Sequence, residues 1–143
     1  MKPKVLVSDN LSPSALKVFQ DRGIQVDFEP ELGKDKKQLA ERIGDYDGLA
    51  IRSATKVTPN ILKRADKLKV IGRAGIGIDN IDISAATRKG VVVMNTPDAN
   101  TISAAEHTMA LILSLSRNES YGHHSQLNGN WDRHKFIGSA LRD

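Results

Sequence analysis

The sequence predicts an α/β domain built on a doubly wound, parallel five-stranded sheet, followed by a long helix and an arm. Short runs rich in β-branched residues alternate with stretches of helical periodicity, which is the pattern of βα units. The chain has 143 residues, of which 39% are hydrophobic, enough for one packed domain and part of a second. It has no cysteine, which excludes disulfide scaffolds, cysteine-ligated metal sites and thiol catalysis.

The elements of the sheet domain follow from this alternation. The expected strands are residues 5–7, 25–28, 48–51, 69–72 and 91–94, and the expected helices are 13–22, 34–44, 59–66 and 80–89. Ser12 and Thr58 each precede a proline, which is typical of an N-cap followed by proline at the first helical position. Gly23 and Gly90 follow helix ends, where a left-handed residue is common.

After the last strand the sequence changes character. Residues 101–117 are predicted to form a long helix with Asn100 as its N-cap. This helix is apolar over more than half of its circumference, so we expect it to be packed on two sides. Residues 118–143 are more polar and are expected to form an arm. The predicted domains are therefore residues 1–99 and residues 100–143.

Charge and hydropathy exclude several classes of partner. Twenty-one Lys and Arg residues stand against 17 Asp and Glu, a net charge of +4, which permits a small anionic substrate but is not the dense basic stripe of a nucleic-acid binder. No run of about 18 apolar residues is present, so no membrane partner is expected. The first apolar run is too short for a signal peptide, and a cytoplasmic protein is expected. The four histidines lack zinc-ligand spacing, so no metal is expected.

The stretch of residues 70–80 runs from a strand through three glycines into a helix. Glycines let the backbone approach a ligand, and free N–H groups near a helix N-terminus favour an anion. The stretch lacks the closing glycine of G-x-G-x-x-G and follows the fourth strand, whereas a dinucleotide fold binds pyrophosphate after its first strand. A small anion site with Arg73 supplying charge therefore fits better. A glycine turn with a purely structural role is the alternative.

Arg52 and Ser53 lie at the carboxyl end of the third strand, where open α/β sheets bind ligands. The Arg52 guanidinium suits bidentate contact with a carboxylate or phosphate. The alternative is a surface arginine bonded to a neighbouring loop. Because Arg52 and Arg73 end strands that are expected to be neighbours, together they favour an anion site.

Two other functions are rejected. Ser53-x-x-Lys56 matches part of a serine-acylation pattern, but the accompanying motifs are missing or out of order. A phospho-receiver domain needs an aspartate at the end of the third strand, with further carboxylates near the first strand such as Asp9. Arg52 occupies the acceptor position, and its charge is opposite to what that chemistry requires.

Five separated segments resemble the N-terminal part of the D-isomer-specific 2-hydroxyacid dehydrogenases, and they occur in order at family-like spacing: 48–56, 70–82, 95–100, 105–108 and 131–138. Arg-Ser-Ala-Thr-Lys and Gly-Arg-Ala-Gly point to the phosphoglycerate branch of the family. The resemblance implies a flavodoxin-like substrate domain beside a Rossmann domain, with catalysis in the cleft between them. It also implies that a C-terminal segment of a full-length chain completes the packing of the substrate domain.

The resemblance assigns roles to individual residues. The substrate-binding residues that it implies are Arg52, Ser53, Arg73, Ala74, Gly75 and Asn100. Ile76 stands where the family contacts its NAD cofactor, and Asn100 lies at the crossover between domains. Residues 101–117 would cross into the cofactor domain, and the arm of residues 118–143 would serve homo-oligomerisation.

The family's dinucleotide motif and its catalytic arginine, glutamate and histidine are expected beyond Gly138, and no catalytic residue is assigned within the chain. The expected function is that of the N-terminal substrate-binding portion of an NAD-dependent enzyme that transfers a hydride from C2 of 3-phosphoglycerate, the first step of L-serine biosynthesis. The portion alone is expected to be inactive. The alternatives are a portion of another D-2-hydroxyacid dehydrogenase, or a non-catalytic module that binds a phosphorylated acid or a partner chain.

Overall fold

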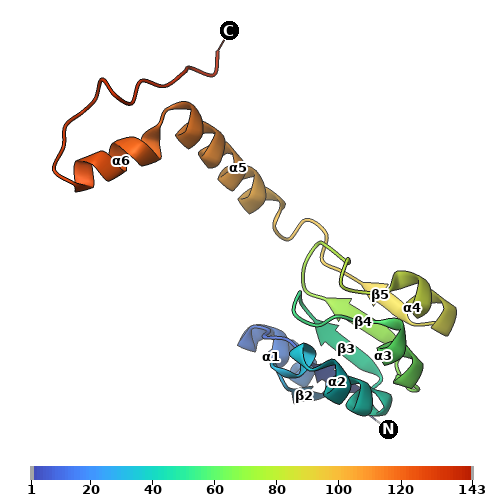
Figure 1. Ribbon diagram of the computed structural model, residues 1–143. Coiled ribbons are helices and arrows are strands. Elements are labelled where there is room, and N and C mark those ends of the chain that lie inside the picture. The colour runs from blue at the N-terminus through green and yellow to red at the C-terminus, as the bar shows by residue number, and fades with distance from the viewer. Residues whose placement is uncertain (1, 143) are drawn as a thin grey trace. The chain divides into compact units, whose positions relative to one another are not determined.

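Five short apolar segments pair side by side in the first part of the chain, in a computed structural model that describes residues 2–142. Figure 1 shows the order of the elements: β1 (Lys4–Val7), α1 (Pro13–Asp21), β2 (Gln25–Phe28), α2 (Lys36–Arg42), β3 (Gly48–Ile51), α3 (Pro59–Arg64), β4 (Val70–Arg73), α4 (Ile83–Lys89) and β5 (Val92–Met94). All the pairings are parallel, and the strand order is β2-β1-β3-β4-β5. This flavodoxin-like order confirms the predicted α/β fold.

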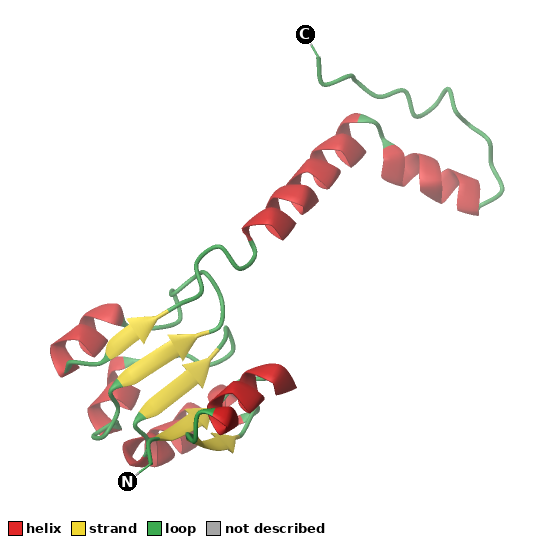
Figure 2. Ribbon diagram, turned by 180° about the vertical axis from the view of Figure 1, so that it is seen from behind, coloured by secondary structure: helices red, strands yellow, loops and turns green. Residues whose placement is uncertain are grey.

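The two faces of the sheet are covered by different helices. In Figure 2, α1 lies in front of the sheet and α2, α3 and α4 lie behind it. Alternate side chains of the central strands divide between these layers, because successive residues of a strand point to opposite faces. Leu6, Leu49 and Ile71 belong to the larger core behind the sheet, whereas Val5 and Val7 pack with the side chains of α1.

The edge strand β5 is apolar on both faces, but only one face is covered. Val93 packs against the larger core, whereas Val92 and Met94 on the opposite face are 57% and 58% exposed. The packing of this sheet edge is therefore incomplete within the described residues.

Most of the predicted helix boundaries are confirmed. The Ser12 hydroxyl accepts a hydrogen bond from the amide of Ala15 at 3.3 Å. Gly23 and Gly90 adopt φ angles of +68° and +75°, as expected of residues that end helices in the left-handed region. Thr58 is the N-cap of α3 with Pro59 at the first position, as predicted, but its side chain makes no capping hydrogen bond and only its carbonyl accepts from the amide of Leu62.

Two helices begin later than predicted because aspartates cap them, and α3 ends at Arg64 rather than at residue 66. α4 begins at Ile83, where the Asp82 carboxylate accepts from the amide of Ala85 at 2.8 Å. Residues 80 and 81 instead bridge back to the segment that precedes α3, through Val57 and Ile81. α2 is capped by Asp35, and short 3₁₀ turns, η1 (Leu32–Lys34) and η2 (Ile43–Asp45), flank it.

The chain divides into two units, Met1–Ala99 and Asn100–Asp143. The second unit contains α5 (Thr101–Ser116) and α6 (Glu119–Leu127). α5 confirms the predicted long helix, but the expected packing on two sides is not observed, because none of its 16 residues is buried. Its exposed large apolar side chains are Ile102, Met109, Leu111, Ile112, Leu113 and Leu115. α6 was not predicted, since its polar sequence contains a glycine and shows no apolar periodicity.

Among residues 2–142, no helix combines the length and the apolar composition that crossing a lipid bilayer requires.

A buried tyrosine joins β1, β2 and α2 through charged partners. The Tyr46 hydroxyl donates to Asp27 at 2.7 Å and accepts from Arg42 at 3.0 Å. The Lys4 ammonium lies 2.8 Å from the Asp27 carboxylate and 4.6 Å from the centre of the Tyr46 ring. The hydrogen bonds from Lys4 and Tyr46 lower the pKa of Asp27 below its usual 3.8, and burial raises the pKa of Tyr46.

This network predicts loss of stability in acid. A carboxylate with a lowered folded-state pKa stabilises the fold above its unfolded pKa, and that stabilisation is lost as the pH falls through the folded pKa. Asp27→Asn is therefore expected to lower the free energy of unfolding at neutral pH, with the difference from wild type shrinking below about pH 4. Urea denaturation across pH measures this difference, and Asp21→Asn at the exposed end of α1 is the control. A difference that does not change with pH would contradict the prediction.

Candidate functional site

The parallel strands bring three loops to the carboxyl edge of the sheet. Asp9 follows β1, Arg52 follows β3, and Arg73 is the last residue of β4. Ile51 and Arg73 are paired in register, and the Ala74 amide donates to the Ile51 carbonyl at 2.8 Å. The fold therefore places the two predicted arginines at the ends of adjacent strands.

The Arg52 side chain is exposed to solvent, while hydrogen bonds to Asp9 and Asn80 hold its main chain. Its guanidinium makes one long contact, in which Nη1 donates to the Asn10 carbonyl at 3.4 Å. Its amide donates to the Asp9 carboxylate at 2.5 Å. Ser53 is exposed beside it. A guanidinium has five N–H donors, so the fork of Arg52 can still bind an anion.

Arg73 is half-buried and lies against the glycine turn. A Cβ atom built on Gly75 would overlap Arg73 Nη1, so the absence of a side chain at Gly75 leaves room for the guanidinium. Arg73 Nε is buried and has no hydrogen-bond partner among the described residues. A partly desolvated cation with an unpaired donor favours an anionic partner.

The turn that follows Arg73 is held by the segment after β5. The Thr96 amide donates to the Gly75 carbonyl at 3.1 Å, and the Asn95 side chain donates to the Ile76 carbonyl at 2.8 Å. The Ile76 side chain is 44% exposed. For a dinucleotide, this turn offers an apolar side chain and main-chain groups at its border, but Asn80 stands where the closing glycine of G-x-G-x-x-G would be.

Two further residues shape the site and were not predicted as part of it. Asp9 is 2% exposed, and its Oδ2 accepts from the amides of Arg52 and Thr55. The Asn80 side chain donates to the carbonyls of the same two residues, at 2.7 Å each. Asp9 lies two residues after the buried strand β1 at the ligand-binding edge, which was the available signal, and Asn80 closes the glycine-rich stretch.

Asn100, the remaining predicted substrate residue, belongs to the second unit. Its predicted role as the N-cap of α5 is wrong for the side chain, which makes no capping hydrogen bond within residues 2–142. Its carbonyl accepts from the amide of Ala104 at 2.9 Å, so the backbone alone starts the helix.

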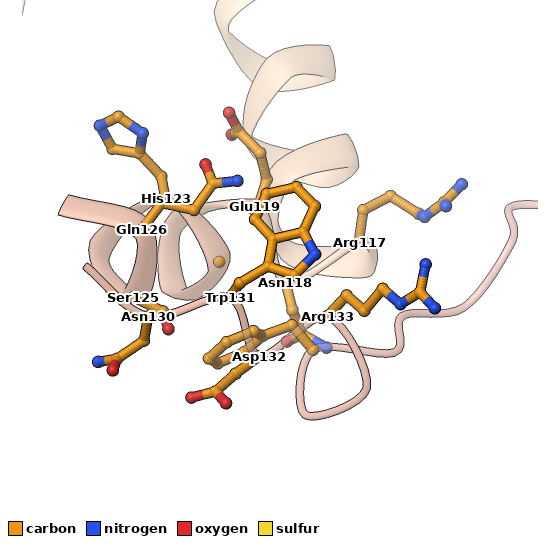
Figure 3. A pocket seen from close by; sticks show the side chains of 12 residues that line it. Arg117, Asn118, Glu119, His123, Ser125, Gln126, Asn130, Trp131, Asp132 and Arg133 are labelled. Carbon is orange, nitrogen blue, oxygen red and sulfur yellow. The ribbon is translucent and has the colours of Figure 1, made fainter. Parts of the chain in front are cut away.

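The second unit has a hollow of about 360 Å³ of its own, formed by α6 and the segment after it. Figure 3 shows Trp131 among its lining side chains, with Arg117 and Arg133 extending away from the ring. The Trp131 side chain is 75% exposed. None of the predicted substrate residues lines this hollow.

The chemistry available at the carboxyl edge is recognition of an anion. All four histidines lie beyond residue 100, so the first unit has no imidazole for acid–base work. The described chain brings together no group of three histidine, aspartate or glutamate side chains that could hold a metal ion. The fold is thus an α/β domain that places two arginines at the carboxyl ends of adjacent strands, an arrangement suited to a small anion.

Comparison with known proteins gives this domain a family. The family model described as "D-isomer specific 2-hydroxyacid dehydrogenase, catalytic domain" matches residues 5–134. The chain therefore belongs to the D-isomer specific 2-hydroxyacid dehydrogenase family.

Similar curated proteins include several named D-3-phosphoglycerate dehydrogenase. The protein of Rattus norvegicus is 48% identical over 138 residues, and that of Methanocaldococcus jannaschii is also 48% identical over 138 residues. Each alignment covers 96% of this chain and 26% of the relative. The chain thus spans about a quarter of the length of these relatives.

Solved structures agree with the assignment. The TT0316 protein of Thermus thermophilus is 30% identical with a TM-score of 0.85, covering 97% of this chain and 46% of that one. The NAD⁺-bound 3-phosphoglycerate dehydrogenase of Entamoeba histolytica is 35% identical with a TM-score of 0.70, covering 82% of this chain and 40% of that one.

Proposed function

We propose that the chain is the substrate-binding portion of an NAD-dependent 3-phosphoglycerate dehydrogenase. The observation that carries the proposal is the placement of Arg52 and Arg73 at the ends of adjacent strands. The substrate has a carboxylate and a phosphate, and each is an anion that a guanidinium binds in bidentate fashion. The names of the similar proteins favour this substrate over other 2-hydroxy acids.

In the complete reaction, the C2 carbon of 3-phosphoglycerate gives up a hydride and its hydroxyl gives up a proton, forming 3-phosphohydroxypyruvate, the first step toward L-serine. NAD⁺, when bound, accepts the hydride. Within this chain, Arg52, Ser53 and the Arg73–Gly75 turn would orient the substrate, and Ile76 would border the nicotinamide. Orientation of a reactant contributes to catalysis by removing translational and rotational freedom before the reaction.

The sequence has no G-x-G-x-x-G motif to bind the NAD⁺ pyrophosphate, and the first unit contains no histidine that could accept the hydroxyl proton. We therefore propose that the chain of 143 residues binds the substrate without oxidising it. A purified sample that reduces NAD⁺ in the presence of 3-phosphoglycerate would overturn this part of the proposal.

Isothermal titration of 3-phosphoglycerate into the chain tests the binding function. Saturable binding is expected, and glycerate, which lacks the phosphate, is expected to bind at least about tenfold more weakly because one charge-assisted contact is lost. Glycerate that binds as tightly as 3-phosphoglycerate would argue for another 2-hydroxy acid. No binding of either compound would overturn the proposal.

A second candidate function, contact with a partner chain, is favoured by exposed apolar side chains in the second unit. Tyr121, Leu127, Trp131 and Ile137 are each about 70% exposed or more. We propose that residues 118–143 join two copies of the chain. Sedimentation equilibrium is expected to give twice the 15.6 kDa of one chain, and a mass that stays at one chain across concentrations would contradict it.

A further inference from the structure

We infer that Asp9 and Asn80 are positioning residues that hold the loop of residues 52–55 in the shape that directs Arg52 toward the substrate. The inference rests on the proposed function, because it assigns a task to the loop that would bind 3-phosphoglycerate. Neither side chain needs to touch the substrate, since both act through the main chain of the loop.

The Asp9 carboxylate accepts hydrogen bonds from the amides of Arg52 and Thr55, the first and last residues of the loop. Asp9 Oδ2 lies 2.5 Å from the Arg52 nitrogen and 3.2 Å from the Thr55 nitrogen. One oxygen atom therefore fixes the first and last residues of the loop relative to the end of β1. The acceptor is a buried carboxylate, and hydrogen bonds to a charged acceptor are stronger than those to a neutral one.

The Asn80 side chain donates hydrogen bonds to the carbonyls of the same two loop residues. Its Nδ2 donates to the Arg52 and Thr55 carbonyls at 2.7 Å each, so both hydrogens of the NH₂ group are used. All four polar main-chain groups of Arg52 and Thr55 are thus satisfied by two side chains, one following β1 and one following β4. The loop is therefore held by residues that follow the two strands on either side of β3.

The Asp9 carboxylate does not neutralise the arginine that it positions. It bonds to the Arg52 main chain, whereas the contact made by the guanidinium is with the Asn10 carbonyl. The positive charge of Arg52 therefore stays available to an anion. A carboxylate paired directly with the guanidinium would compete with the substrate.

Burial of Asp9 is unfavourable by itself. Its Oδ1 is buried without a hydrogen-bond partner among the described residues, and an unpaired buried oxygen destabilises a fold. Gly33 closes the space beside it, where a Cβ would lie 3.0 Å from Oδ1. The hydrogen bonds that offset this cost are those from the loop amides to Asp9 Oδ2. We therefore assign Asp9 the role of holding the loop.

Asn80→Asp tests the inference with a side chain of the same shape. A carboxylate cannot donate to the two carbonyls and places a negative charge against them. The Kd for 3-phosphoglycerate is expected to rise at least about tenfold, from the loss of roughly two hydrogen bonds that fix the loop. Asn60→Asp, on the exposed surface of α3, adds the same charge elsewhere in the unit and is expected to leave the Kd within about twofold of wild type.

Amide hydrogen exchange in the absence of ligand separates positioning from general stability. Asn80→Asp is expected to speed exchange at the Arg52 and Thr55 amides while amides in the central strands keep their protection. A substitution that only weakened the fold would speed exchange throughout the unit. Asp9→Asn is the second variant, and it should produce the same local change because a neutral amide is a weaker acceptor.

A third readout is the ratio of the Kd of Asn80→Asp to the Kd of Asn60→Asp, measured as a function of pH. Protonation of the substrate affects both Kd values equally and therefore cancels in the ratio. As the pH falls, the introduced carboxyl group of Asn80→Asp would become protonated and regain one donor, so the ratio is expected to fall toward one. A Kd for Asn80→Asp within twofold of Asn60→Asp at neutral pH, or a raised ratio that does not change with pH, would overturn the inference. Failure of wild type to bind 3-phosphoglycerate would instead overturn the proposed function, and that result is obtained before any variant is made.

Discussion

Replacing Arg52 with alanine is expected to weaken 3-phosphoglycerate binding by about tenfold to a hundredfold. A charge-assisted contact contributes about 1.5–3 kcal/mol, and each 1.4 kcal/mol corresponds to a factor of ten in Kd. The Arg52 side chain is exposed, and its one side-chain hydrogen bond within residues 2–142 is to the Asn10 carbonyl at 3.4 Å, so its removal leaves little unsatisfied in the folded protein. The melting temperature is therefore expected to stay close to that of wild type while binding weakens.

Two further variants show which property of Arg52 matters. Arg52→Lys keeps the charge but loses the planar fork, so an intermediate Kd is expected if binding is bidentate. Arg88→Ala removes an exposed arginine from the last turn of α4 and serves as the matched control. Equal Kd values for Arg52→Ala and Arg88→Ala, measured by calorimetry, would show that the substrate does not bind at this loop.

The second large effect is expected at Gly33, where alanine should lower the free energy of unfolding by about 1–3 kcal/mol. A Cβ at this position would overlap the Thr55 hydroxyl and lie 2.7 Å from the Ser8 carbonyl oxygen. The Thr55 hydroxyl cannot move freely, because it is buried and bonded to the Ser8 hydroxyl at 2.9 Å. The collision pushes directly on the loop that follows Arg52, so binding should weaken as well.

Urea denaturation followed by circular dichroism measures the loss at Gly33. Gly72→Ala is the control in the same unit, because a Cβ there meets nothing within 4 Å. Relief is expected in Gly33→Ala/Thr55→Ala, in which the overlapping hydroxyl is removed. If Gly33→Ala were as stable as Gly72→Ala, the close packing around Ser8 and Thr55 would not hold in solution.

The sheet could be predicted from the sequence because each strand carries its own signal. β1 and β3 read as continuous apolar runs because both of their faces are buried, and the intervening helices are marked by Ser12, Gly23 and Gly90. Strand ends in parallel sheets share one edge, so Arg52 and Arg73 could be placed near one another before the strand order was known. The chemistry of the edge followed from residue type.

The contacts that shape the loop could not be predicted, because they join residues far apart in the sequence. Asp9 meets Arg52 across 43 positions, and Asn80 meets it across 28. No periodicity links such pairs. For the helix of residues 101–116 the prediction was wrong in a different way. Its apolar composition predicted burial, but none of its residues is buried by the rest of residues 2–142. A capping hydroxyl likewise depends on local geometry, which differs between Ser12 and Thr58.

The most direct test of the central claim is a titration of 3-phosphoglycerate into isotope-labelled chain, followed through amide chemical shifts by NMR. The account predicts saturable shifts concentrated at residues 52–55 and 73–77, at the carboxyl edge of the sheet. It also predicts that Arg52→Ala needs about tenfold to a hundredfold more ligand to reach the same shifts. Shifts confined to the hollow of the second unit, or no shift at saturating ligand, would contradict it.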